Sequence, residues 1–352
     1  MARSETASRP VSPPAWLPIL AFTVLAAGDL YYVKWHPYYG RAFVAAAQQS
    51  LGASIVSGTG AAPPAAGWQA GLSYAAAYIR AIWQALVLAL VLGAGVEVLL
   101  PRGMVSRLFA GDGASARATA AALPSMMCTC CAAPVTIGLI RSEADTAAAL
   151  AYFLANPVLN PATLVFIGFV LGWGWAGLRL VLGVALVFLL SHFAARLMPA
   201  GRHLPPPHPA TTPDPAQVGY LRAYLAALWR LASRLVPEYF LLVFALGATR
   251  AWLFPAMTPV IGHAGWLPPL LAAIGTLFVI PTAGEVPIVQ VLQHVGLGSA
   301  GAAALLVTLP AVSLPSLVML GRALPAPVLG VLGVGTFGFG LLAAYAAVLL
   351  GL

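Results

Sequence analysis

Charged residues are scarce in this sequence. Only 7% of its 352 residues are Asp, Glu, Lys or Arg, whereas 61% are hydrophobic. Because a soluble domain carries about 25% charged residues, the composition excludes a soluble domain and predicts an all-α polytopic membrane protein in a lipid bilayer. The net charge of +8 does not indicate nucleic acid as a partner, because the arginines are scattered between apolar runs and form no basic stripe.

Cysteine is equally scarce. The three cysteines, Cys128, Cys130 and Cys131, lie within four residues of one another. This spacing excludes a disulfide framework, and a bridge between the adjacent Cys130 and Cys131 would be strained. We therefore expect free thiols.

The signature motifs of several enzyme classes are also absent. The sequence contains no Gly-rich phosphate loop, no nucleophile elbow and no H-E-x-x-H helix. Its six histidines show no metal-ligand spacing. We therefore expect neither ATP-driven transport nor enzymatic activity, and no cofactor.

Long apolar runs dominate what is present. A membrane span needs about 20 apolar residues, and the runs predict about nine apolar segments. The first of them ends in Tyr31, Tyr32, Lys34 and Trp35, which is typical of an interfacial belt. The predicted segments cover residues 15–33, 76–100, 118–140, 145–172, 174–198, 234–254, 266–292, 299–320 and 326–350.

The composition divides the chain into four parts. Residues 199–219 are rich in proline, which predicts a linker rather than a packed core. Residues 34–75 are less hydrophobic than the runs around them, so we expect them outside the bilayer core. The four predicted parts are an N-terminal anchor helix with an extramembrane segment (1–75), a first repeat (76–198), a proline-rich cytoplasmic linker (199–233) and a second repeat (234–352).

Arginines predict the orientation in an inner (plasma) membrane. Arg102, Arg107 and Arg117 cluster in one predicted loop, and further arginines surround the linker. Since cytoplasmic loops carry an excess of positive charge, both loops are expected in the cytoplasm. Three apolar segments lie between these loops, and an odd number of spans would place the two loops on opposite sides of the membrane. One segment is therefore expected not to span fully, and the second repeat would then be inverted relative to the first.

The two halves resemble each other at a constant spacing. Pro134 and Pro157 recur as Pro287 and Pro310, in each case 153 residues later (287 − 134 = 153; 310 − 157 = 153). Internal duplication with interrupted helices is the pattern of secondary transporters, whose binding sites lie at the repeat interface. The repeat therefore predicts a transporter with its site where the two halves meet.

Prolines predict where the helices break. A proline removes a backbone donor and clashes with the preceding turn, and irregular backbone at membrane depth is tolerated only inside protein or beside a watery cavity. The predicted break positions are Pro124, Pro134, Pro157, Pro161, Pro287, Pro310 and Pro315.

The cysteines lie at the first predicted break. Thiolates prefer soft or borderline metals and metalloids such as Cu(I), Zn(II) and trivalent arsenic, so Cys128, Cys130 and Cys131 are candidate ligands for a metal or metalloid substrate. In a regular helix Cys128 and Cys131 share one face and Cys130 points elsewhere, so a three-sulfur site requires the break. The alternative is that the cysteines are small buried hydrophobes that suit tight packing.

Polar residues at the other breaks complete the candidate site. Glu285 lies in an otherwise uncharged run and is the predicted proton carrier, because ionisable groups at membrane depth are costly. The alternative is a structural carboxyl bonded to free backbone N–H groups. Asn156, Asn160, Ser313 and Thr282, the counterpart of Thr129, are predicted to line the substrate cavity, with helix–helix hydrogen bonding as the alternative.

Four motifs resemble a known family: LPSMMCTCCAAP (123–134), ALAYFLANPVLNPATLVF (149–166), PTAGEVPIVQ (281–290) and LPAVSLPSLVML (309–320). They are similar to those of the predicted permeases that include the ArsP-type organoarsenical efflux permeases and the YraQ-type permeases. The resemblance covers roughly residues 76–350 and implies an inner-membrane permease. In the characterised members it implies export of trivalent arsenicals, with a thiol group that here corresponds to the three cysteines.

We therefore expect a secondary-active permease that exports a thiophilic substrate, with trivalent arsenicals first. A membrane thiol–disulfide oxidoreductase is one alternative, but each half would then need a redox cysteine, and Gly284 and Glu285 stand where the first half has Cys131 and Ala132. A metal-binding membrane subunit or sensor is another. The sequence leaves the oligomeric state open, a homo-oligomer included.

Overall fold

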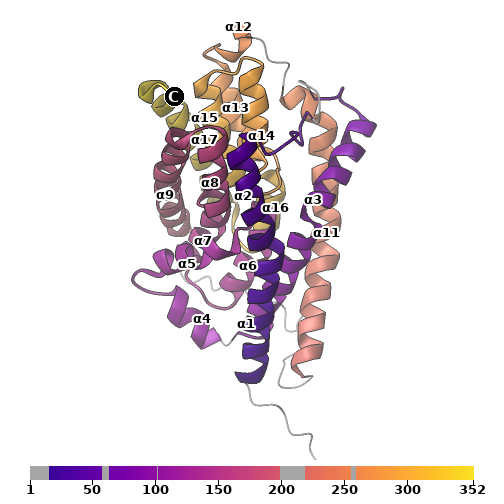
Figure 1. Ribbon diagram of the computed structural model, residues 1–352. Coiled ribbons are helices and arrows are strands. Elements are labelled where there is room, and N and C mark those ends of the chain that lie inside the picture. The colour runs from indigo at the N-terminus through magenta and orange to yellow at the C-terminus, as the bar shows by residue number, and fades with distance from the viewer. Residues whose placement is uncertain (1–15, 58–62, 101, 199–218, 255–258) are drawn as a thin grey trace, which may run out of the picture.

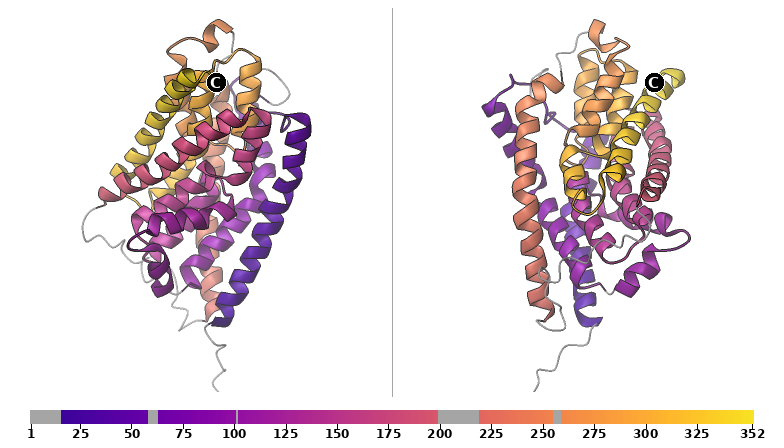
Figure 2. Two further views of the ribbon diagram at one scale, coloured as in Figure 1. Left: turned by 60° about the vertical axis from the view of Figure 1, so that its left-hand side comes forward. Right: turned by 180° about the vertical axis from the view of Figure 1, so that it is seen from behind.

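The computed structural model describes residues 16–57, 63–100, 102–198, 219–254 and 259–352, and its regular elements within these ranges are helices (Figure 1). The chain starts with a continuous helical rod. It consists of α1 (Trp16–Leu30), a π-helical turn (Tyr31–Trp35) and α2 (His36–Gln48). This rod lies on the outside of the bundle, in front in Figure 1 and along the right-hand edge of the left view in Figure 2. The first predicted apolar segment, 15–33, therefore forms part of a longer helical element.

Six candidate membrane spans are present in the described part of the chain, where the sequence predicts nine segments. Four of the six are single helices, and two contain a break. The single helices are α3 (Trp68–Val98), α9 (Trp173–Arg196), α11 (Tyr220–Leu253) and α17 (Ala326–Leu350). The broken spans are α7 (Thr146–Val158) with α8 (Pro161–Val170), and α15 (Ser299–Ala311) with α16 (Leu314–Leu320).

Two predicted segments, 118–140 and 266–292, are not single spans. Each is divided into two short helices by a loop, because polar and proline residues interrupt the apolar run. In the first half α5 (Ala114–Ala122) and a 3₁₀ turn (Leu123–Ser125) precede α6 (Thr129–Arg141). In the second half α13 (Leu267–Leu277) precedes α14 (Glu285–His294). Two further short helices are α4 (Arg102–Phe109) and α12 (Pro259–Gly262).

The internal repeat extends to the helix boundaries. The helices α7 and α15 start and end 153 residues apart (299 − 146 = 153; 311 − 158 = 153). The same offset relates the starts of α5 and α13, of α8 and α16, and of α9 and α17, and the ends of α6 and α14. The long helices α3 and α11 start at nearly this offset (220 − 68 = 152). Each half therefore contains the same series of six helices.

The first helices of the two series pack side by side. Figure 1 shows α3 running from the top of the view to the bottom and α11 running from the bottom to the top. The short helices α5 and α13 lie towards opposite ends of the molecule in the same view. The innermost span is α15 with α16, with 83% of its apolar window buried, whereas α11 has 28%. The two broken spans are therefore the most buried of the six, at 83% and 67%, followed by the long helix α3 at 61%.

Two long helices run across the predicted domain boundaries. Residues 68–75, predicted as extramembrane, are the first turns of α3. Residues 220–233, predicted as part of the linker, belong to α11. The proline-rich stretch 199–218 lies outside the described residues, as do residues 1–15, 58–62, 101 and 255–258.

Several prolines do not break the helix in which they lie. Pro134 is inside α6, so the predicted break at this position is wrong. Pro287 lies in the first turn of α14, where a missing N–H costs no intrahelical bond. Pro157 and Pro310 lie in the last turns of α7 and α15.

The breaks themselves lie beside the prolines, at residues 126–128, 159–160, 278–284 and 312–313. Pro124 lies in the 3₁₀ turn that precedes the first of these breaks. Pro161 and Pro315 are at the starts of α8 and α16. A proline in the first turn of a helix favours a start at that point, because its fixed φ suits the helix and its missing N–H needs no partner.

Candidate functional site

The cysteine loop brings the three thiols together. Met126 has a left-handed backbone (φ 44°), which turns the chain out of the 3₁₀ helix, and Cys128 has an extended backbone at the N-cap of α6. As a result the Cys128 sulfur lies 3.0 Å from that of Cys130 and 3.2 Å from that of Cys131. All three are buried free thiols. The three-sulfur cluster therefore forms through a break in the helix, as the sequence pattern requires.

Asn156 of α7 holds this loop in place. Its side-chain oxygen accepts hydrogen bonds from the Ser125 hydroxyl (2.5 Å) and from the Met127 backbone N–H (3.1 Å). Its side-chain nitrogen donates to the Tyr152 carbonyl (3.0 Å). Both the oxygen and the nitrogen of the Asn156 amide bind protein groups, so Asn156 holds the loop that carries the cysteines.

Two tyrosines of α3 connect the cysteine cluster to the second half. The Tyr78 hydroxyl lies 3.6 Å from the Cys130 sulfur and donates to the Ile280 carbonyl (3.1 Å). The Tyr74 hydroxyl donates to the Val279 carbonyl (2.5 Å). These bonds satisfy carbonyl groups that the break at 278–284 leaves without helical partners. Sequence reasoning missed both tyrosines, although their i, i+4 spacing places them on one helix face.

A second contact between the halves joins the starts of two helices. The Thr129 hydroxyl lies 3.0 Å from the Ser313 hydroxyl. Ser313 in turn forms a reciprocal capping box with Ser316 at the start of α16. Ser313 is the counterpart of Asn160 in the repeat (313 − 160 = 153). Asn160 caps α8 by accepting from the Thr163 N–H (3.2 Å), and its buried side-chain nitrogen has no partner in the described structure.

Glu285 forms a buried ion pair with Arg179 of α9. Their nearest nitrogen and oxygen atoms are 2.5 Å apart, and both side chains are at most 2% exposed. Arg179 also donates to the carbonyls of Pro157 (2.8 Å) and Val158 (3.2 Å), which end α7. The sequence left open a structural carboxyl bonded to backbone N–H groups. In the structure the Glu285 carboxylate is paired with the Arg179 guanidinium instead. Sequence reasoning missed Arg179, although a charged residue inside an apolar span is itself a signal.

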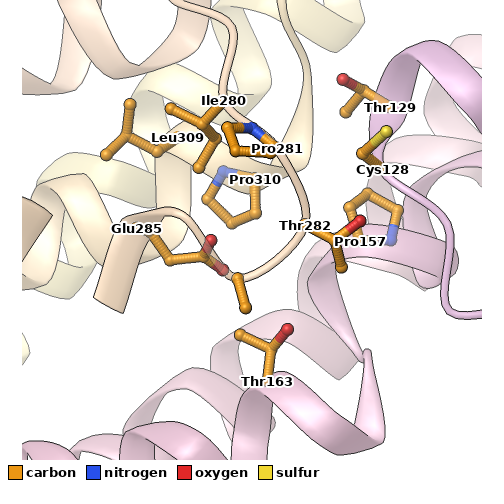
Figure 3. Close-up of a pocket in the computed structure, with 11 residues that line it drawn as sticks. Cys128, Thr129, Pro157, Thr163, Ile280, Pro281, Thr282, Glu285, Leu309 and Pro310 are labelled. Atoms are coloured by element: carbon orange, nitrogen blue, oxygen red, sulfur yellow. The ribbon is translucent and has the colours of Figure 1, made fainter. Parts of the chain in front are cut away.

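The second carboxylate oxygen of Glu285 is buried and has no hydrogen-bond partner among the described residues. Glu285 lines a pocket that both halves share, and Figure 3 shows Cys128 and Glu285 on opposite sides of it. The lining residues are Cys128, Thr129, Pro157 and Thr163 from the first half and Ile280, Pro281, Thr282, Ala283, Glu285, Leu309 and Pro310 from the second. Of the predicted polar residues, Thr282 and Glu285 line this pocket.

Lys34 does not lie exposed with the other residues of the predicted belt. Tyr31 and Tyr32 are exposed as a belt requires, but Lys34 is only 3% exposed. Its ammonium lies 3.4 Å from the Thr282 hydroxyl and 5.7 Å from the centre of the Tyr38 ring. The adjacent Trp35 donates to the Pro124 carbonyl (2.9 Å). The π-helical turn sets which side chains face inward, and no count of apolar residues reveals this turn.

The fold and the site together define a class of protein. A multi-pass bundle with an internal repeat, with broken helices and a pocket that both halves line, is the architecture of a membrane transporter.

Comparison with known proteins defines the family. The ArsP_1 family, described as predicted permeases, matches residues 68–348, and the chain belongs to this family. The chain is also 46% identical over 320 residues to the UPF0718 protein YraQ of Escherichia coli (strain K12). The aligned region covers 90% of this chain and 91% of that protein. No solved structure matches the chain. The resemblance seen in the sequence motifs is thereby confirmed at the level of the family.

Proposed function

We propose that this permease is a secondary-active exporter of thiophilic substrates in the inner membrane, and that trivalent arsenicals, inorganic or organic, are its substrate class. One observation carries the proposal: three thiol sulfurs lie together at a helix break, and one of them lines a pocket that both halves of the repeat share. Trivalent arsenic is soft and prefers such ligands.

Binding by ligand exchange fits this cluster. When arsenite reaches the three thiols, three arsenic–oxygen bonds break and three arsenic–sulfur bonds form, and each thiol proton leaves with a hydroxide as water. A methylated arsenical carries one carbon substituent and uses two of the thiols in the same way. Hydrolysis of the arsenic–sulfur bonds reverses the exchange and releases the substrate on the far side.

The arrangement of the halves supports alternating access. We propose that the two series of helices are inverted repeats, because α3 and α11 run in opposite directions and the matched short helices lie towards opposite ends. A site between inverted repeats is reached from either side by rocking one repeat against the other. The contact between Thr129 and Ser313 joins the two halves next to the pocket, so this contact would change during such a motion.

Glu285 would couple transport to the proton gradient. Its carboxylate is held by Arg179 on one oxygen, its other oxygen has no hydrogen-bond partner among the described residues, and the residue lines the pocket. Protonation would neutralise the carboxylate and weaken its attraction to Arg179. The pair joins α14 to α9, so a weaker pair would release one half from the other.

The test is uptake of trivalent arsenicals, inorganic and methylated, into everted vesicles. The native chain is compared with a Cys128→Ser/Cys130→Ser/Cys131→Ser variant, and membrane content of both proteins is matched by immunoblot. We expect uptake by the native chain and its loss in the triple variant, because oxygen is a poor ligand for a soft centre. Equal uptake by both proteins would show that the cysteines serve packing, and no uptake by either would refute the substrate class.

A further inference from the structure

Lys34 is a buried charge without a charged partner. Its printed contacts are the Thr282 hydroxyl and the Tyr38 ring, and no ion pair involves Lys34 within the described residues. A buried ion that is not compensated costs several kcal/mol. Lys34 also lies outside residues 68–348, the part that the family match covers. The cation therefore enters the site from the helical rod that precedes the repeat.

The other charges around the pocket cancel. Glu285 carries one negative charge and Arg179 one positive charge, and they form a single buried pair. The positive charge of Lys34, whose ammonium contacts the pocket-lining Thr282, takes no part in this pair. A bound complex with one net negative charge would compensate it.

We propose that the three cysteines and Lys34 form a binding site for a soft divalent metal cation, which is held as an anionic tri-thiolate complex with Lys34 as its fixed counter-charge. On binding, three metal–sulfur bonds form and three thiol protons leave for solvent. A charge of +2 with three thiolates of −1 leaves a complex of −1. The attraction between this complex and Lys34 is strong because both are away from water.

The charge of the complex separates this ligand from an arsenical. Trivalent arsenic with three thiolates is neutral, and so is a methylated arsenical with two. Neither complex compensates Lys34. This inference shares the cysteine cluster with the proposed function but does not depend on arsenical transport. It predicts that Lys34 discriminates between the two classes of soft ligand.

The geometry of the cluster admits such a metal after a small adjustment. Zinc–thiolate bonds of about 2.3 Å in tetrahedral geometry place sulfurs roughly 3.8 Å apart. The sulfur of Cys128 is 3.0 Å from that of Cys130 and 3.2 Å from that of Cys131, so each pair must open by less than about 1 Å. Cys128 precedes the regular part of α6 and faces the pocket, which allows this movement.

The experiment measures binding of two probes to the purified full chain in detergent. Cadmium(II) is titrated by its ultraviolet sulfur-to-metal charge-transfer band, and phenylarsine oxide by competition with a fluorescent dithiol-reactive arsenical. The proteins are the native chain, Lys34→Met, which keeps the length and removes the charge, and Lys34→Arg, which keeps the charge. We expect Lys34→Met to bind cadmium about 10- to 100-fold more weakly, as loss of one charge pair at an effective dielectric constant near 20 requires.

The controls separate charge from structure. Lys34→Arg should stay within about threefold of the native affinity for cadmium, and phenylarsine oxide should bind all three proteins equally, which also shows that the cluster is folded. A native chain that does not bind cadmium, or a Lys34→Met variant that binds it unchanged, overturns the proposal. An equal loss for both probes also overturns it, because Lys34 then acts by positioning the cysteines. Failure of arsenical uptake with cadmium binding intact would refute only the proposed function.

Discussion

The two helix breaks that precede α6 and α14 stand at matching places in the repeat and carry opposite chemistry. The first presents three thiols, whereas the second presents a hydroxyl, Thr282, and a carboxylate, Glu285. The first is held by an uncharged network around Asn156, and the second by an ion pair with Arg179. The two matching backbone frames thus carry a cluster of three thiols in one half and a buried ion pair in the other.

The largest expected effect comes from removing the charge that holds the second break. Arg179→Met leaves Glu285 buried and uncompensated, which costs about 3–5 kcal/mol in stability. Thermal unfolding in detergent measures the change. The double variant Arg179→Met/Glu285→Gln should recover a large part of the loss, because no buried charge is left alone. A double variant as unstable as the sum of the two single variants would refute the ion-pair account.

The corresponding change at the first break involves no charge and should cost less. Asn156→Leu introduces the residue that the second half has at this place, Leu309. It leaves the Met127 N–H without its acceptor, whereas the Ser125 hydroxyl keeps the Ala122 carbonyl, and the cost is about 1–3 kcal/mol. Binding of phenylarsine oxide should weaken as well, because the loop no longer holds Cys128 in place. Unchanged arsenical affinity together with reduced stability would show that the loop needs no support from Asn156.

Glu285→Gln tests whether the second break senses protons. The substitution keeps the shape and removes the titrating group, so uptake into everted vesicles should no longer respond to an imposed pH gradient. For the native chain we expect a change in rate of about tenfold or less across the gradient, equivalent to roughly 1.4 kcal/mol. Glu97→Gln, at the ion pair with Arg141 and Arg230, is the matched control outside the pocket. Transport by Glu285→Gln with the native pH dependence would exclude Glu285 as the proton carrier.

The smallest effect compares the matched threonines directly. Thr129→Val removes the hydroxyl contact with Ser313, at a cost of about 0.5–1.5 kcal/mol. Thr282→Val removes a longer contact, 3.4 Å to Lys34, and should cost less. Paired unfolding measurements in one detergent give the difference. The reverse order would indicate that Lys34 is held mainly through Thr282.

Much of the architecture was predictable from the sequence. The apolar runs predicted a polytopic helical protein, and the 153-residue spacing of four prolines predicted a repeat that the helix boundaries now follow. Six of the nine predicted segments correspond to candidate spans in the described part of the chain, because 118–140 and 266–292 each contain a loop and α1 alone has only 15 residues. Pro134 illustrates the same limit: it lies inside α6, since buried packing on all sides tolerates one missing backbone bond.

The candidate site was predictable only in part. The cysteines, Thr282 and Glu285 follow from residue type and from the repeat, and the structure places Cys128, Thr282 and Glu285 around one pocket. Lys34 and Arg179 do not follow, because each lies far in the sequence from its partner: Thr282 for Lys34 and Glu285 for Arg179. Only packing decides whether a charge near a span end faces lipid headgroups or the core.

The sequence by itself determined the membrane environment, the duplicated frame and the gathering of three thiols at one helix break, because these depend on composition, spacing and local backbone chemistry. The tertiary structure alone decided which charges meet: Arg179 with Glu285, and Lys34 with the shared pocket. The physical reason is that a buried charge is stabilised by whatever lies within a few ångströms in space, and in a duplicated bundle those neighbours come from different parts of the chain.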